Sequence, residues 1–316
     1  MGVTNKTSVS KFILLGLSNI ASLQILYFVI FLIMYLLILS GNLLLIIVVR
    51  LNSRLQTPMY FFLSNLSLVD ICFSSTVVPK MLINTISKDK SISYLGCATQ
   101  MYFHLALGAT ECLVLAVMAY DRYTAICKPL QYMVIMDAKL CLLLVGGCWV
   151  VSFLNSLILT AFTFQLPYCR SNLISHFFCE MPPLLRLSCR DIWFNEVAEY
   201  ISVVVIAFGS CLLISVSYLF ITMTVLTFRS PKERRKAFST CASHISIVAL
   251  YYGTVMFMHL RPRSSYSPEQ DRIVSILYTV VTPMLNPMIY SIRNKDIKKS
   301  IKKLVYKPSF SAQKMC

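Results

Sequence analysis

The sequence predicts an all-α membrane protein: a seven-transmembrane helix bundle, N-terminus outside, with a short amphipathic helix after the seventh span. The first observation is composition, because 57% of the 316 residues are hydrophobic and only 13% are charged. Soluble domains have about 25% charged residues. The second is patterning, since the apolar residues fall into seven runs, each long enough to cross about 30 Å of hydrocarbon as a helix.

The seven runs are separated by polar or basic segments. They cover residues 23–49, 58–78, 92–126, 140–162, 197–228, 237–260 and 273–292. The third and fifth are longer than a bilayer requires, so they are expected to tilt or protrude. We therefore expect an outer N-terminal segment (1–22), a seven-helix domain (23–292) and a cytoplasmic amphipathic helix with a tail (293–316).

Charge sets the orientation. The net charge is +16, and most lysines and arginines gather near residues 50–54, 128–139 and 229–236 and after 292. By the positive-inside rule these segments are cytoplasmic, facing the anionic leaflet of the lipid bilayer rather than nucleic acid. The N-terminus is then outside, where Asn5 in Asn-Lys-Thr is an acceptor for an N-linked glycan.

Three polar residues lie within the first three spans. Asn42 in the first is expected to bond a neighbouring helix. Asp70 in the second and Glu111 in the third are acids at membrane depth, each costing about 2.5–3.5 kcal/mol on insertion scales. We expect both carboxyl groups to face the bundle interior and to share a cation or a proton.

The third span ends in Met-Ala-Tyr-Asp-Arg-Tyr, residues 118–123, which places Asp121 beside Arg122. The pair has two interpretations. It is either a helix end whose charges reach water, or a partly dry pair whose making and breaking is a signal. The topology puts it on the cytoplasmic side.

An outer loop over residues 163–196 contains three cysteines, Cys169, Cys179 and Cys189, and Cys97 lies at the outer start of the third span. Four cysteines allow three pairings. Two disulfides are expected to pin this loop over the bundle mouth, and the residues alone do not fix which. The segment from His176 to Glu180 carries metal-ligand types, but a bridged Cys179 has no thiolate to offer. We expect neither a metal nor another cofactor.

The later spans add motifs on the cytoplasmic half. Tyr218 closes the fifth span, and Lys-Ala-Phe-Ser-Thr-Cys-Ala-Ser-His (236–244) opens the sixth. In the seventh, Pro287 breaks the hydrogen-bond ladder and Asn286 can satisfy the freed backbone. Beyond it, apolar residues recur among lysines, as in a helix that lies on the inner leaflet.

These motifs form one pattern, which resembles the rhodopsin-like (class A) G-protein-coupled receptors and, within them, the vertebrate olfactory receptors. The resemblance covers the whole chain and rests on Gly41-Asn42, Pro58-Met59-Tyr60 with Asp70, the 118–123 and 236–244 strings, and Asn286-Pro287-Met288-Ile289-Tyr290. Tyr251-Tyr252-Gly253 stands where other class A receptors carry a tryptophan motif, as the olfactory family prefers. Ser210 stands where many class A receptors carry a proline.

The resemblance implies an odorant receptor of the plasma membrane, in olfactory neuron cilia, that activates a stimulatory G protein and raises cAMP. It implies a Cys97–Cys179 bridge and leaves Cys169–Cys189 as a second. It also implies a switch in which Asp121 holds Arg122 at rest and tyrosines engage it after the sixth span swings outward. The switch residues are Asp121, Arg122, Tyr123, Tyr218, Asn286, Pro287 and Tyr290.

A small volatile ligand needs a closed, mostly apolar cavity with few polar anchors. The resemblance places it in the outer half of the bundle, below the long loop. The matching positions are His104, Leu105, Gly108, Ala109, Cys112, Ser202, Ile206, Tyr252, Val255, Met256, His259, Ile276 and Thr279. We expect His104 and His259 to be the polar anchors.

Other functions are weighed against this one. A membrane transporter or channel is the main alternative, and it would predict internal repeats, paired broken helices or a charge-lined pore. A light receptor is disfavoured because residues 273–292 contain no lysine for a Schiff base. No enzyme is expected, since the polar residues form no nucleophile–base or metal constellation.

Overall fold

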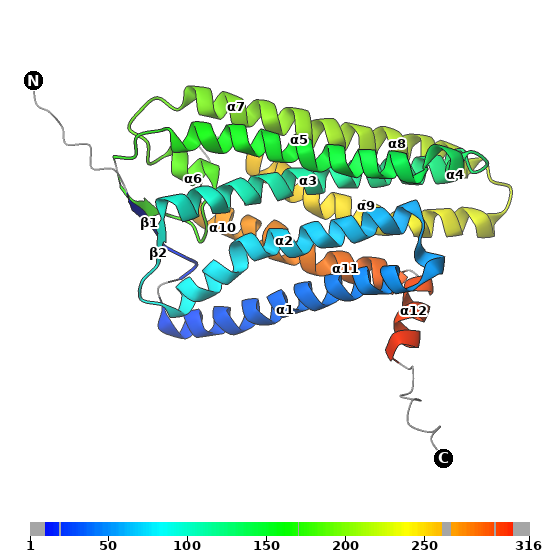
Figure 1. Ribbon diagram of the computed structural model, residues 1–316, viewed down its shortest axis with the longest axis horizontal. Coiled ribbons are helices and arrows are strands. Elements are labelled where there is room, and N and C mark those ends of the chain that lie inside the picture. The colour runs from blue at the N-terminus through cyan, green and yellow to red at the C-terminus, as the bar shows by residue number, and fades with distance from the viewer. Residues whose placement is uncertain (1–9, 19, 170, 261–266, 294, 306–316) are drawn as a thin grey trace, which may run out of the picture.

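A computed structural model describes residues 10–18, 20–169, 171–260, 267–293 and 295–305. Its architecture is a bundle of long helices, with a small sheet at the outer end and a short helix running crosswise at the inner end (Figure 1). Within these residues, seven helical segments are long and apolar enough to cross a membrane. The predicted fold class is confirmed.

Five spans are single helices: α1 (Ala21–Leu51), α2 (Pro58–Ile86), α3 (Tyr94–Cys127), α5 (Ala138–Phe164) and α9 (Pro231–Leu260). The other two each contain a turn of π-helix. One runs α7 (Trp193–Val203), η2 (Val204–Phe208) and α8 (Gly209–Leu226). The other runs α10 (Pro268–Ile276), η4 (Leu277–Val281) and α11 (Thr282–Arg293). Short elements lie between them: η1 (Ser53–Leu55), α4 (Tyr132–Ile135) and α6 (Met181–Leu185).

Local signals explain where helices begin. Ser93 and Asp137 cap α3 and α5, because their side-chain oxygens accept from the backbone N–H groups of Gly96 (3.0 Å) and Leu140 (2.8 Å). Two boundaries differ most from the predicted runs. The second span continues through Pro79 to Ile86, and α9 begins at Pro231 because its basic first turns stay helical beyond the apolar run.

Helix α3 is the centre of the bundle. In its most apolar stretch 61% of the residues are buried, against 28% in the corresponding stretches of α1 and α5. Helix α3 packs against α2, α5 and α8. Large apolar side chains on the outer helices instead face outward, as Ile33, Leu143 and Leu212 do. That distribution suits lipid-facing helices around one buried helix.

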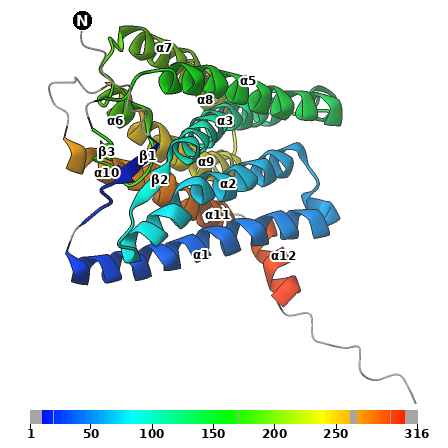
Figure 2. The same cartoon turned by 60° about the vertical axis from the view of Figure 1, so that its left-hand side comes forward.

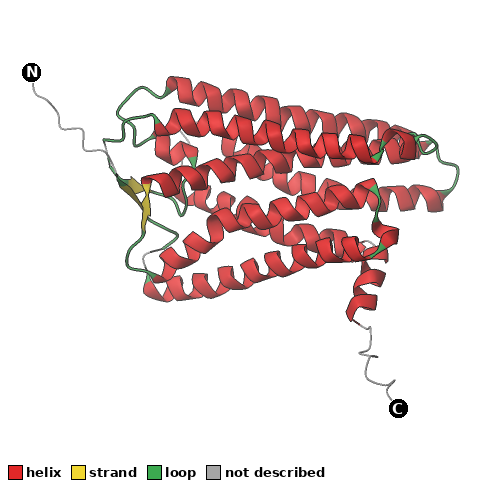
Figure 3. Cartoon of the chain, viewed as in Figure 1, coloured by secondary structure: helices red, strands yellow, loops and turns green. Residues whose placement is uncertain are grey.

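A three-stranded sheet forms part of the outer cover (Figures 2 and 3). Its strands are β1 (Lys11–Leu14), β2 (Ser91–Ser93) and β3 (Leu173–Ile174), in the order β2-β1-β3. The central strand is antiparallel to β2 and parallel to β3. Phe12 and Leu14 are fully buried, and the Phe12 ring packs on Tyr94 and Tyr168. Residues 11–14 of the N-terminal segment are therefore the central strand of the outer sheet, which the sequence did not predict.

Helix α12 (Lys295–Val305) follows the seventh span at the inner end. Ile297 and Ser300 of this helix are buried, and Lys298 and Lys299 between them are exposed. The Asn52 side-chain amide donates to Ser300 Oγ at 2.6 Å. This bond ties α12 to the first inner loop.

Candidate functional site: an outer cavity and an inner charge pair

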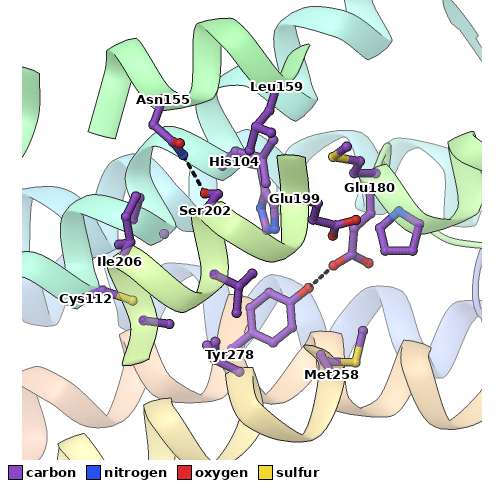
Figure 4. A pocket seen from close by; sticks show the side chains of 18 of the residues that line it. His104, Cys112, Asn155, Leu159, Glu180, Glu199, Ser202, Ile206, Met258 and Tyr278 are labelled. Atoms are coloured by element: carbon purple, nitrogen blue, oxygen red, sulfur yellow. Dashed lines mark hydrogen bonds between the residues drawn. The ribbon is translucent and has the colours of Figure 1, made fainter. Parts of the chain in front are cut away.

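A cavity of about 120 Å³ lies in the outer half of the bundle, far larger than the roughly 10–15 Å³ that admits one water. It is bounded by α2, α3, α5, α7, η2, α9 and η4, and residues at the start of α6 close it from outside (Figure 4). Eight of the residues expected to contact a ligand line it: His104, Leu105, Gly108, Ala109, Cys112, Ser202, Ile206 and Val255.

Four other expected residues lie outside the lining. Tyr252 is buried below it, with its hydroxyl 2.6 Å from Ser210 Oγ and 3.0 Å from the Cys112 carbonyl oxygen. Thr279 donates to the Ser275 carbonyl at 2.5 Å. Met256 packs on the main core, and Ile276 on the cluster between α1 and α2. The His259 side chain lies outside the described residues, as does Asn5.

The cavity floor is set by a close approach of α9 to α3. The Tyr251 hydroxyl donates to the Gly108 carbonyl oxygen at 2.7 Å. A Cβ at Gly108 would stand 3.6 Å from both this hydroxyl and the Phe73 ring. Gly108 therefore leaves space that any longer side chain would fill.

His104 is held between aromatic rings. Its ring centroid is 4.8 Å from that of Phe73, in a stacked arrangement, and 4.6 Å from that of Phe178. The side chain is only 5% exposed yet borders the cavity. The position and orientation of the His104 ring are thus fixed before any ligand binds.

Sequence reasoning missed several polar residues of the cavity. Asn155 on α5 donates to Ser202 Oγ at 2.8 Å, which makes a polar spot in the wall. The outer loop over residues 163–196 forms the lid of the cavity, and its Glu180 lines the cavity together with Glu199 of α7. In the sequence, an isolated asparagine within a membrane span gives no signal that separates helix packing from ligand contact.

Two disulfides anchor the lid. Cys97 is joined to Cys179, with Cα atoms 5.5 Å apart, and Cys169 is joined to Cys189. The Gln100 side chain supports the first bridge by accepting from the Cys179 N–H at 2.9 Å. No group of three metal-ligand side chains gathers within the described residues, and the disulfide takes the thiolate of Cys179.

A buried polar group joins the lid to the seventh span. The Tyr278 hydroxyl donates to Glu180 Oε1 at 2.6 Å, and His176 Nε2 lies 3.6 Å from Glu180 Oε2. Burial lowers the pKa of His176 to about 3, helped by Arg272 and His104. Burial raises the pKa of Glu180 to about 7, with Asp271 adding and the Tyr278 bond opposing. His176 is therefore neutral at outer pH, and the contact is not an ion pair.

These shifts predict a pH-dependent stability. Glu180 stabilises the fold fully below its ordinary pKa of 4.5, and this is lost as the pH rises to about 7. His176 acts oppositely, losing stability as the pH falls from 6.5 to about 3. The free energy of unfolding of Glu180→Gln, taken relative to that of wild type, should therefore rise by about 3 kcal/mol as the pH rises from 4.5 to 7.

Thermal unfolding of the purified receptor at a series of pH values measures this difference. His176→Gln is the matched variant. Its free energy of unfolding relative to wild type should fall as the pH rises from 3 to 6.5, because wild type regains the contribution of neutral His176 over that range. A constant offset between wild type and Glu180→Gln at every pH would contradict the assignment.

The charge pair at the inner end of α3 is almost dry. Arg122 Nε donates to Asp121 Oδ2 at 3.1 Å, and the guanidinium Nη2 bonds the same oxygen. The side chains of Asp121 and Arg122 are only 1% and 12% exposed. The other carboxylate oxygen accepts from the Tyr132 hydroxyl of α4 at 2.7 Å. Beside the pair, the Tyr218 hydroxyl lies 2.8 Å from His244 Nδ1, which links α8 to α9.

Between cavity and charge pair lies a buried polar cluster. The Asn286 amide lies 3.0 Å from both Asp70 oxygens, and the Asn42 amide donates to the Pro283 carbonyl at 3.0 Å. Neither Glu111 oxygen nor the Tyr290 hydroxyl has a hydrogen-bond partner among the described residues. All of these side chains are nearly fully buried.

Comparisons with known proteins give a consistent answer. A family model described as "Olfactory receptor" matches residues 31–307. The Mus musculus protein Olfactory receptor 5AP2 is 50% identical over 313 residues, 96% of this chain and 97% of the relative. The Homo sapiens protein Olfactory receptor 5I1 is 50% identical over 304 residues, 95% and 96% of the two chains. The Canis lupus familiaris Olfactory receptor-like protein OLF1 is 50% identical over 304 residues, covering 95% and 97%.

Proposed function

Because the chain belongs to the olfactory receptor family, whose members are multi-pass plasma-membrane receptors and not enzymes, we propose that it binds small, mostly apolar odorants in the outer cavity. Binding activates a stimulatory G protein and raises cAMP. Membership of this family favours a receptor over the alternative function of a membrane transporter or channel. The eight expected residues that line the cavity are the proposed ligand contacts.

The observation that carries this proposal is the course of α3. His104 borders the cavity and Arg122 forms the charge pair, and both are on one unbroken helix. At 1.5 Å per residue they stand roughly 27 Å apart along it. One rigid element therefore joins the ligand site to the cytoplasmic face.

The proposed switch needs α9 to move against α3. Tyr251 holds the two helices together at the cavity floor through its bond to Gly108. A ligand that binds better when this bond is open shifts the population toward the open state, by no more than its difference in affinity for the two states. Arg122 then leaves Asp121, with Tyr218 and Tyr290 as its proposed new partners. We further propose that Asp70 and Glu111 share a cation or a proton in the resting state.

Filling the cavity tests its role. Gly108→Leu should raise the agonist concentration for half-maximal cAMP by about 5- to 150-fold, because an overpacked site costs about 1–3 kcal/mol. The matched control is Gly146→Leu on the exposed face of α5, where an added Cβ meets nothing within 4 Å. Dose–response curves at equal surface expression make the comparison, and equal curves for the two variants would refute the cavity as the site.

A further inference from the structure

The lining of the cavity contains two carboxyl groups, Glu180 and Glu199, and the described lining residues include no lysine or arginine. We propose that the ligand is a protonated amine on an apolar body, with its ammonium group paired to the Glu180 carboxylate and attracted by Glu199. This inference rests on the proposed function, since it names the chemical class that the odorant site selects.

Hydrogen-bond donors facing the cavity are mostly committed within the protein. The Tyr251 hydroxyl donates to Gly108, the Tyr278 hydroxyl to Glu180 Oε1, and the Asn155 amide to Ser202. Acceptors remain, because a carboxylate can accept about four bonds. A ligand that donates hydrogen bonds fits such a wall better than one that only accepts them.

Among the described residues, Glu180 has no cationic partner close at hand. His176 faces it at 3.6 Å, beyond hydrogen-bond distance, and is neutral because burial lowers its pKa to about 3. Arg272 on α10 is directed to the lid backbone, where its Nε donates to the Ser175 carbonyl at 3.2 Å. Asp271 on the same helix adds negative charge near Glu180. A buried carboxylate with neutral contacts is costly when ionised, and an ammonium group removes that cost.

Glu199 reaches the same region from another helix. It lies on α7 and is half-buried, and Figure 4 shows its carboxyl group directed toward that of Glu180. When ionised, this second carboxyl group offers hydrogen-bond acceptors and no donor, which suits a ligand that donates.

The aromatic rings of the cavity lining suit an ammonium group as well. Phe73, Tyr251 and Tyr278 border the cavity, and the Phe73 and Tyr278 centroids are 6.3 Å apart. Cations within about 6 Å of such ring faces are attracted by the ring quadrupole. Without a ligand role, Glu180 would serve only to latch the lid to Tyr278, and the receptor would then show no preference for amines.

Matched triads of odorants test the proposal: a primary amine, the alcohol and the carboxylic acid on the same hydrocarbon skeleton. cAMP dose–response curves are recorded for wild type, Glu180→Gln and Glu199→Gln. Glu196→Gln is the control, because Glu196 lies one turn earlier on α7 and outside the described lining. Surface expression is measured by flow cytometry, and Glu199→Gln decides the outcome if Glu180→Gln fails to reach the surface.

We expect the amine to be about tenfold more potent than the alcohol and the acid to be weakest. Both lining variants should reduce the amine-to-alcohol ratio about tenfold, and Glu196→Gln should leave it unchanged. In wild type the ratio should rise between outer pH 6 and 8, as Glu180 with its pKa of about 7 ionises. The groups facing that carboxyl are His104, His176, Glu199, Asp271, Arg272 and Tyr278.

Alcohols or acids that equal the amine in potency would overturn the inference, as would an unchanged ratio in a lining variant. If such a neutral or acidic agonist loses potency in Gly108→Leu, the cavity remains the odorant site and only the amine preference is wrong. If Gly108→Leu leaves every agonist unaffected, the proposed function itself fails.

Discussion

Replacing Arg122 by alanine is expected to abolish the agonist-stimulated cAMP response, by at least about a hundredfold at saturating agonist, and to leave ligand binding intact. The reason is position: Arg122 lies at the cytoplasmic end of α3 and is bonded to Asp121 with little exposure to water. In the activated state its guanidinium group is the proposed contact surface for the switch tyrosines and the G protein. Its ion-pair partner Asp121 is not among the described residues that line the cavity.

The matched control is Arg54→Ala. Arg54 is an exposed arginine of the first inner loop, so this variant removes the same charge from the same side of the membrane. It should signal normally at equal surface expression. A full cAMP response from Arg122→Ala would mean that the pair is an inert helix end, which is the other interpretation of the Asp-Arg motif.

Loss of the Cys97–Cys179 bridge is expected to have the largest effect on stability. The two cysteines are 82 residues apart in sequence, and closing a loop of that length is worth about 4–5 kcal/mol in the chain-entropy model. The bridge also fixes the lid residues next to Glu180, so the cavity loses its cover with it. Cys97→Ser should therefore lose most surface expression and the agonist response.

The shorter bridge provides a graded comparison. Cys169 and Cys189 are 20 residues apart, which corresponds to about 3 kcal/mol, so Cys169→Ser should be less damaging. Cys211→Ser is the neutral control, because Cys211 is a free, half-buried cysteine of α8. Equal surface expression and melting temperature for Cys97→Ser and Cys211→Ser would contradict the structural role of the lid bridge.

The fold could be predicted from the sequence where its causes are local. Each span is a continuous apolar run, and the lysines and arginines that orient it are adjacent to it in sequence. The outer sheet has no such signal. Strand β1 has four residues and is defined by partners at 91–93 and 173–174, so only the folded chain brings its hydrogen bonds together.

The cavity lining likewise has a part that the sequence predicts and a part that it does not. Its α3 wall follows from helical spacing, which places His104 and Gly108 one turn apart on one face. Its α9 wall depends on how that helix is rotated. Adjacent residues point about 100° apart, so Tyr251 and Met258 line the cavity where Tyr252 and Met256 were expected. Glu180 was weighed only as a metal ligand, because the sequence does not reveal that the lid turns it inward.

The most direct test of the central claim, that one helix carries a ligand signal from the cavity to the G protein, is nucleotide exchange on a purified stimulatory G protein. The receptor is reconstituted in lipid nanodiscs as wild type, Gly108→Leu and Arg122→Ala, and agonist binding is measured on the same samples. If this claim holds, only wild type stimulates exchange at moderate agonist, Gly108→Leu binds the agonist more weakly, and Arg122→Ala binds it normally without stimulating exchange. Exchange by Arg122→Ala at the wild-type rate, or no exchange by wild type with bound agonist, would contradict it.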